Sequence, residues 1–106
     1  MTAIDGISQT TGIERIVEVS AAEGGVRVVI RDRKLATELA SVVAPADWLM
    51  NVLADSPEGP QVLAGATGDA LSVEVRRNEV WLAVGVPDAA VGLDDLTDAV
   101  AAAVPA

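Results

Sequence analysis

The core of this chain has to be built almost entirely from aliphatic side chains. The sequence contains no Phe, Tyr or Cys, and its only aromatic residues are Trp48 and Trp81. Apolar residues nevertheless make up 51% of its 106 residues, enough for one hydrophobic core in a chain too short for two. Each large aliphatic side chain contributes about 1.5–3 kcal/mol when fully buried. Val-rich strands and Ala-rich helices suit such a core.

The segments 13–19 and 26–31 predict an antiparallel hairpin, because apolar and polar residues alternate along them. Residues 20–25 form the turn and supply two glycines, which accept positive φ. On the side expected to face outward lie Ile16 and Val29, together with Glu14, Glu18, Arg27 and Arg31. Opposite charges on neighbouring strands predict cross-strand ion pairs on this face.

Apolar residues then recur at helical spacing. Asp32 is a good N-cap, and Pro45 is a helix stop or the first turn of a following helix. The apolar stripe that predicts a helix between them consists of Leu35, Leu39, Val42 and Val43. A second apolar face over residues 46–54 includes Trp48, which we expect to lie in the core. A helical hairpin and one kinked helix fit equally well.

A second β region follows a Pro- and Gly-rich loop at residues 56–60. Residues 61–65 are a weak strand candidate, whereas residues 71–76 and 80–86 alternate clearly and predict a hairpin. A final helix is expected to start at residues 93–95 and to end before Pro105.

The predicted element order is therefore β-β-α(α)-β-β-β-α. It favours a single α+β domain over residues 13–106, preceded by a flexible N-terminal arm at residues 1–12, which are polar and rich in turn-forming residues. The expected architecture is one antiparallel sheet of four or five strands with helices packed on one face.

Missing residue types argue against several chemistries. Without Cys there is no disulfide, thiolate nucleophile or Cys-based zinc site, and without His the commonest general base is absent. Asp94, Asp95 and Asp98 form the densest acidic group, but they match no calcium-loop pattern and suit the first turn of a helix. We therefore expect no catalytic residues, no metal and no cofactor.

The charge balance restricts the partners. The net charge is −9, with seven acidic and five basic residues in positions 1–53 and nine acidic and two basic residues in positions 54–106. Such a chain repels phosphate backbones and anionic membranes. Its acidity serves solubility alone or steers it toward a basic partner protein. No apolar stretch is long enough to cross a bilayer and no signal peptide is seen, so a cytoplasmic location is expected.

Trp81 is the residue that suggests a binding surface. If Asn78 and Glu79 form a two-residue hairpin loop, Arg76 lies directly opposite Trp81 on the outward face, near Glu74. Ordinary sheet packing would explain this pair, and so would a binding site, because Trp and Arg are enriched at interaction hot spots. The candidate partner-binding residues are Trp81, Arg76, Glu74, Ile16 and Val29.

Three functions remain open. The first is a non-enzymatic protein-interaction module of the immunity, anti-factor or chaperone type, which binds its partner through the outward sheet face. The second is an assembly subunit that forms a homodimer or larger oligomer through that face or an edge strand. The third and least favoured is a carboxylate-based enzyme or small-ligand carrier. Usage rich in Ala, Val and Asp and poor in Lys indicates a GC-rich bacterial genome.

Overall fold

The computed structural model describes residues 1–64 and 69–104. These residues form eight strands and two helices. The strands are β1 (Thr2–Ile7), β2 (Glu14–Ala22), β3 (Gly25–Asp32), β4 (Glu38–Ala44), β5 (Gln61–Leu63), β6 (Leu71–Arg76), β7 (Glu79–Val84) and β8 (Asp88–Gly92). The helices are α1 (Ala46–Asp55), which follows β4, and α2 (Leu93–Ala103), which follows β8.

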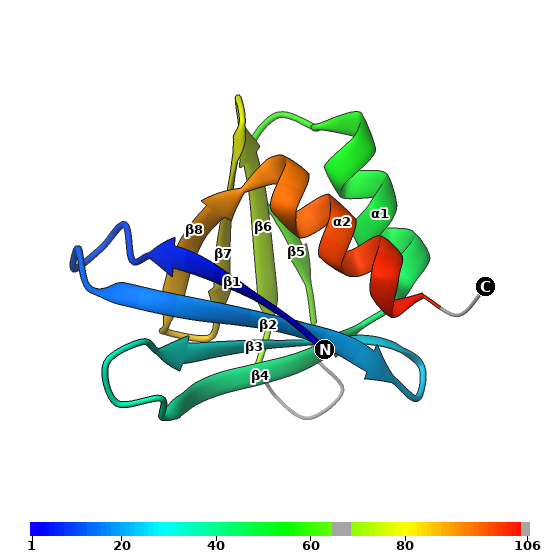
Figure 1. The fold of residues 1–106 in the computed structure, drawn as a ribbon. Helices are drawn as coiled ribbons and strands as arrows, with labels where there is room; N and C mark the ends of the chain where they lie inside the picture. The colour runs from blue at the N-terminus through cyan, green and yellow to red at the C-terminus, as the bar shows by residue number, and fades with distance from the viewer. Residues whose placement is uncertain (65–68, 105–106) are drawn as a thin grey trace.

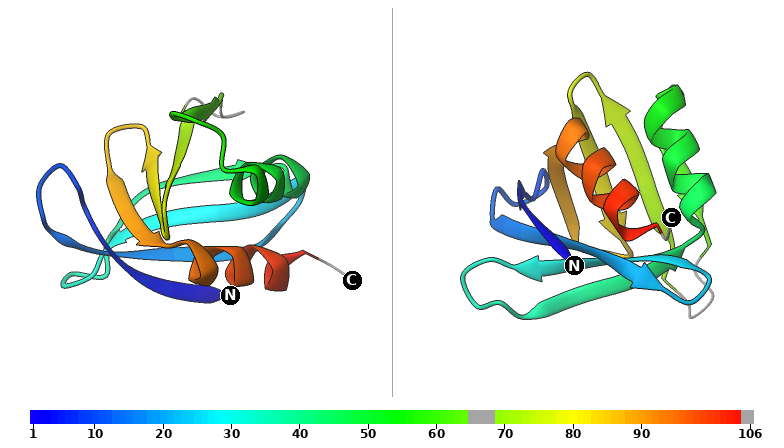
Figure 2. Two further views of the ribbon diagram at one scale, coloured as in Figure 1. Left: turned by 90° about the horizontal axis from the view of Figure 1, so that it is seen from above. Right: turned by 45° about the vertical axis from the view of Figure 1, so that its right-hand side comes forward.

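All eight strands belong to one antiparallel sheet in the order β4-β3-β2-β1-β8-β7-β6-β5 (Figure 1). The expected sheet of four or five strands with helices packed on one face is therefore wrong. The sheet curves into a nearly closed, barrel-like structure, and the two short helices lie in the space between its halves (Figure 2). Among the described residues, β4 and β5 form the two unpaired edges.

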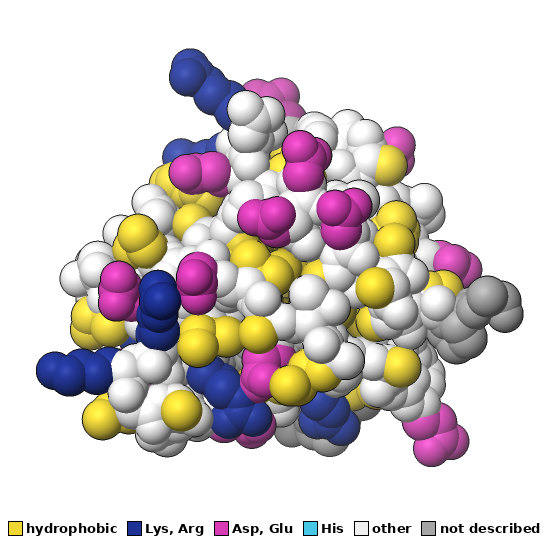
Figure 3. Space-filling view, in the orientation of Figure 1, with side chains coloured by type: hydrophobic (Ala, Val, Ile, Leu, Met, Phe, Trp, Pro, Cys, Tyr) yellow, Lys and Arg dark blue, Asp and Glu magenta, His cyan; other side chains and the backbone are white. Residues whose placement is uncertain are grey.

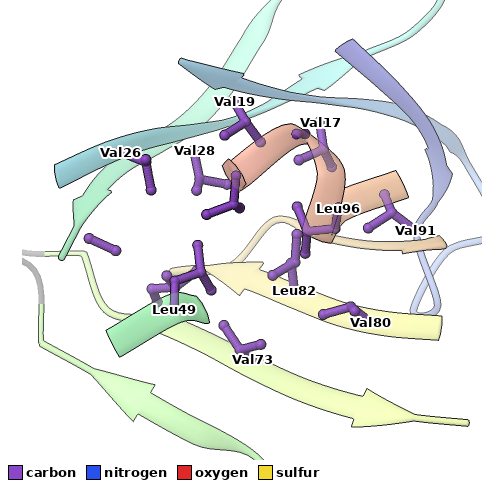
Figure 4. Packing of buried hydrophobic residues seen from close by; sticks show 14 of the residues in the cluster. Val17, Val19, Val26, Val28, Leu49, Val73, Val80, Leu82, Val91 and Leu96 are labelled. Atoms are coloured by element: carbon purple, nitrogen blue, oxygen red, sulfur yellow. The ribbon is translucent and has the colours of Figure 1, made fainter. Parts of the chain in front are cut away.

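The core fills the concave side of the sheet, as alternation predicts. In the β2–β3 hairpin, Val17 pairs with Ile30 and Val19 with Val28, and all four side chains are buried. The β6–β7 hairpin contributes its own inward-facing row (Figure 4). The helices complete the core with Leu49, Val52, Leu53, Leu96, Ala99 and Val100. Trp48, which was expected in the core, is half-buried and packs against the margin of this cluster without belonging to it.

The segment 33–44 is the largest error of the sequence interpretation. The N-cap bond exists, since the backbone N–H of Leu35 donates to Asp32 Oδ1 at 2.9 Å, but no helix follows it. Ala36 has φ 57°, which interrupts a right-handed helix, and β4 begins at Glu38. Adjacent Val42 and Val43 favour a strand, and Pro45 disfavours helical geometry at the residue before it.

Two further strands lie where loops were expected. Residues 2–7, assigned to the flexible arm, form β1 and pair with β2 along their whole length. Their alternation is weak because Ile4 is the only buried residue of the six. Residues 88–92 form β8, whose consecutive Ala89, Ala90 and Val91 are all buried, so no period of two marks them as a strand.

The other elements confirm the sequence predictions. Both hairpins, the helix over residues 46–54 and the final helix are present close to their expected bounds. The weak strand candidate at residues 61–65 corresponds to β5, but its last residue, Gly65, lies outside the described residues. The same holds for Pro105.

Candidate protein-binding surface

Trp81 lies on the outer face of the sheet, the side away from the core. Its neighbours along β7, Val80 and Leu82, are buried, so strand alternation directs Trp81 outward, where it is half-buried. Arg76 does not lie directly opposite it, as the sequence predicted. The two turn residues are Arg77, at φ 56°, and Asn78, so the turn lies one residue earlier than predicted. The cross-strand partner of Trp81 is therefore Glu74, two residues before Arg76.

Arg76 nevertheless reaches Trp81 diagonally. Its guanidinium carbon lies 3.8 Å from the centroid of the indole ring, a cation–π contact worth about 0.5–1 kcal/mol at an exposed site. Arg76 Nε also donates to Glu74 Oε2 at 2.8 Å, and Trp81 Nε1 donates to Glu79 Oε2 at 3.3 Å. The indole is therefore held by contacts on its face and at its nitrogen, beside a hollow of about 440 Å³.

Two residues that sequence reasoning missed extend this surface. Ala90 of β8 pairs with Trp81 on one side and with Ile7 of β1 on the other. The three side chains therefore form one row across three strands on the outer face. Ile7 is 50% exposed. We call Trp81, Arg76, Glu74, Glu79, Ala90 and Ile7 the tryptophan surface.

Ile16 and Val29 do not extend the tryptophan surface. Both point outward, as predicted, but from β2 and β3, in the other half of the sheet. Val29 is only 5% exposed, because it lies between Glu18 and Ser41 on the neighbouring strands. Ile16 is half-buried and pairs with Asp5 and Arg31. Of the five candidate residues, the structure brings together Trp81, Arg76 and Glu74.

Ion pairs cover the outer face around Val29. Arg31 forms an ion pair with Glu18 across the β2–β3 hairpin, which confirms a predicted cross-strand contact. Its Nη2 also lies 3.8 Å from Glu38 Oε1. The hydrogen bond to Glu18 raises the pKa of Arg31 above its ordinary value. Such contacts leave this part of the sheet polar.

Asp88 fixes the chain beside the tryptophan surface. Its carboxylate accepts hydrogen bonds from Ser8 Oγ at 2.6 Å and from the backbone N–H of Gln9 at 2.9 Å. Burial acts to raise the pKa of Asp88, but the bonds from Ser8, Gln9 and Thr10 bring it below its ordinary value. Asp88 therefore ties the loop that follows β1 to the start of β8.

Arg15 is the one charged residue that the structure buries among those described. It faces inward at the start of β2, opposite Asp32 of β3, and its Nη1 lies 3.6 Å from Asp32 Oδ2. Its Nε has no hydrogen-bond partner among the described residues. The pair lies at the end of the β2–β3 hairpin on the inner side of the sheet, whereas the tryptophan surface lies on the outer side.

The described residues contain no group of three or more His, Cys, Asp or Glu side chains arranged to hold a metal ion. In the same part of the chain, neither helix combines the length and apolarity needed to span a bilayer. The outer face around Trp81 combines an aromatic ring stacked on a cation, an exposed aliphatic neighbour and carboxylates around them. Neither protein-family models nor curated proteins nor solved structures yield a significant match to this chain.

Proposed function

We propose that this chain is a non-enzymatic protein-interaction module that binds a partner protein through the tryptophan surface. The observation that carries the proposal is the row formed by Trp81, Ala90 and Ile7 on the outer face. The indole is half-buried and Ile7 is 50% exposed. Apolar area is therefore exposed on the outer face of the sheet, which does not pack against the core.

The pairing of Trp81 with Arg76 supports an anchoring role. Trp and Arg are among the residue types most enriched at interaction hot spots, and here the guanidinium of Arg76 stacks on the indole of Trp81. A side chain that is already ordered loses less conformational entropy when a partner binds. The surface is therefore preorganised for binding.

The negative charge around the indole and on the whole chain favours a positively charged partner. Glu74 and Glu79 border the indole, and Asp88 lies two residues before Ala90 in β8. The whole chain carries a net charge of −9, which speeds association with a positively charged protein and disfavours acidic ones. An immunity protein, an anti-factor or a chaperone for a basic protein fits this description. We place the module in the cytoplasm, since a chain without Cys gains nothing from an oxidising compartment.

Affinity capture with matched variants tests the proposal. The wild type, the double variant Trp81→Ala/Arg76→Ala and the control Val62→Ala are compared as baits in quantitative capture experiments. Val62 is 65% exposed on the outer face of β5, so it tests the general effect of losing exposed apolar area. A partner retained by wild type and control but lost by the double variant supports the tryptophan surface. Identical partner lists for all three baits would contradict the proposal that the tryptophan surface binds the partner.

Homo-oligomerisation is the second candidate, and one observation favours it. β4 pairs with β3 alone among the described strands, and its outer edge includes Leu39, which is 40% exposed. An apolar edge without Lys or Pro is a template for pairing with a second copy. Light scattering over a concentration series tests this, and a constant monomer mass at high concentration excludes it. The net charge of −9 opposes self-association.

A further inference from the structure

β1 uses only one of its two edges along most of its length. All six of its residues pair with β2, but on the other side only Ile7 has a strand partner, Ala90 of β8. Alternate residues of an antiparallel strand direct their N–H and C=O groups to each edge. Residues 2–6 therefore present backbone groups without a strand partner on the β8 side, which makes this edge a template for another strand.

The open edge borders a groove between β1 and α2, two elements that lie side by side at the front of the molecule (Figure 1). The groove has a volume of about 550 Å³, within the range of ligand-binding clefts. On the α2 side, Ala99 and Ala102 are short and leave space above the helix. The lining residues are Thr2, Ala3, Ile4, Asp5, Asp95, Asp98, Ala99 and Ala102.

The charges of the groove are all negative. Asp95 and Asp98 are three residues apart on α2, so they share one face of the helix, and they have no ion pair or hydrogen bond with the rest of the described chain. Asp5 contributes a third carboxylate, although Arg33 Nη1 lies 3.6 Å from its Oδ2. Figure 3 shows acidic side chains gathered over the start of α2. Neither helix contains Lys or Arg.

These features select among possible occupants. A second copy of this chain would bring another net charge of −9 to an acidic groove, and the resulting repulsion opposes it. An extended segment with basic side chains suits both the unpaired edge and the negative charge of the groove. Its backbone can pair with β1 while its cations approach Asp95 and Asp98.

We propose that the groove between β1 and α2 binds an extended, Lys- or Arg-bearing segment of a partner protein, which adds as a strand to the open edge of β1. The groove is distinct from the tryptophan surface, and the peptide binding proposed for the groove is additional to the function proposed for that surface. Strand addition supplies affinity through the backbone, whereas Asp95 and Asp98 select the cationic side chains.

Fluorescence anisotropy with three labelled ten-residue peptides tests the proposal. The first alternates Val and Lys, the second replaces each Lys with Glu, and the third is the first with N-methylated backbone amides. The protein variants are Asp95→Asn/Asp98→Asn and, as a control, Asp47→Asn/Asp55→Asn, which removes the same charge from α1. Thermal unfolding checks that each variant is folded.

We expect saturable binding of the Val–Lys peptide and none of the Val–Glu peptide. Removing two charge-assisted contacts weakens binding by about tenfold or more in Asp95→Asn/Asp98→Asn, while Asp47→Asn/Asp55→Asn changes it by less than about twofold. N-methylation causes a loss of about tenfold or more, because it removes the donors of the added strand. Equal losses in both charge variants, equal binding of the N-methylated peptide or no saturable binding would each overturn the proposal.

The double variant Trp81→Ala/Arg76→Ala separates the two proposals. It is expected to bind the Val–Lys peptide as the wild type does, because neither residue lines the groove. A loss of peptide binding in this variant would show that the peptide binds at the tryptophan surface. That result would overturn the groove proposal and leave the proposed function standing.

Discussion

Gly6 lies so close to Ala90 that a Cβ atom built on Gly6 would be 2.8 Å from the Ala90 carbonyl oxygen. The same atom would be 2.9 Å from Cγ1 of Val91. The crossing of β1 and β8 therefore requires the absence of a side chain at Gly6, although its φ is not in the left-handed region. This close approach brings Ile7 beside Ala90 and so completes the tryptophan surface.

The first prediction concerns this crossing. Gly6→Ala should lower the free energy of unfolding by about 1–3 kcal/mol, the usual effect of forcing a methyl group into a packed site. Chemical denaturation measures the change, and Gly12→Ala is a useful comparison because nothing lies within 4 Å of the added atom there. Since Gly12 has φ +74°, its variant reports backbone strain alone. A Gly6→Ala protein as stable as the wild type would show that β1 and β8 are farther apart than described.

The second prediction concerns the pH dependence of stability. The pKa of Asp88 is lowered in the folded state, so its stabilising contribution is present above the unfolded pKa of about 3.9. That contribution disappears as the pH falls through the lowered folded pKa. Asp88→Asn should therefore reduce the free energy of unfolding at pH 7 by about 1 kcal/mol.

The measurement is a series of melting curves from pH 7 to pH 2 for the wild type and Asp88→Asn. The gap between the two melting temperatures should narrow as Asp88 becomes protonated in the wild type. Ser8→Ala removes one donor to the carboxylate and should reproduce part of the effect at pH 7. A gap that stays constant down to pH 2 would contradict the assigned hydrogen bonds.

The third prediction is that Val29 contributes to stability and Ile7 to partner binding. Val29 is 5% exposed, so Val29→Ala should lower the free energy of unfolding by about 1–2 kcal/mol through the loss of two buried methyl groups. It should leave partner binding unchanged. Ile7, at 50% exposed, should show the opposite pattern in Ile7→Ala: little loss of stability and weaker binding. Denaturation and binding measured on the same preparations provide the comparison, and weaker binding in Val29→Ala would restore Val29 to the binding surface.

The fourth prediction concerns the stacking of Arg76 on Trp81. In a Trp48→Phe background, Trp81 is the only tryptophan and its fluorescence reports its surroundings directly. Arg76→Ala should increase quenching by acrylamide, because it uncovers the indole face that the guanidinium covers. Arg27→Ala removes the same charge from β3 and should have no effect. Equal quenching in both variants would show that Arg76 does not cover the ring.

The sequence predicted the strands whose residues alternate and the helices whose stripes are clear. Val26, Val28 and Ile30 alternate with exposed or outward-facing residues, so their strand could be recognised locally. The apolar pattern predicts a helix where β4 lies, because Leu35, Leu39, Val42 and Val43 also match a period of 3.6. Ala36 at φ 57° decides against the helix, and a backbone angle of this kind is not encoded in the apolar pattern.

The candidate surface could be predicted only in part, for a related reason. Trp81 and Arg76 lie on one hairpin, so strand alternation alone placed both on the outer face. Their relative register depended on which residues form the turn, and the turn falls at Arg77 and Asn78. Ile7 joins them through the pairing of β1 with β8. This contact links distant parts of the sequence, so no local pattern predicts it.

Calorimetric titration of a captured partner with the purified wild type and Trp81→Ala tests the central claim most directly. Because Trp81 is the expected anchor, its truncation should weaken binding by about 2 kcal/mol or more, which corresponds to about thirtyfold in Kd. Melting curves should show that the variant remains folded. An unchanged Kd for folded Trp81→Ala would contradict the account.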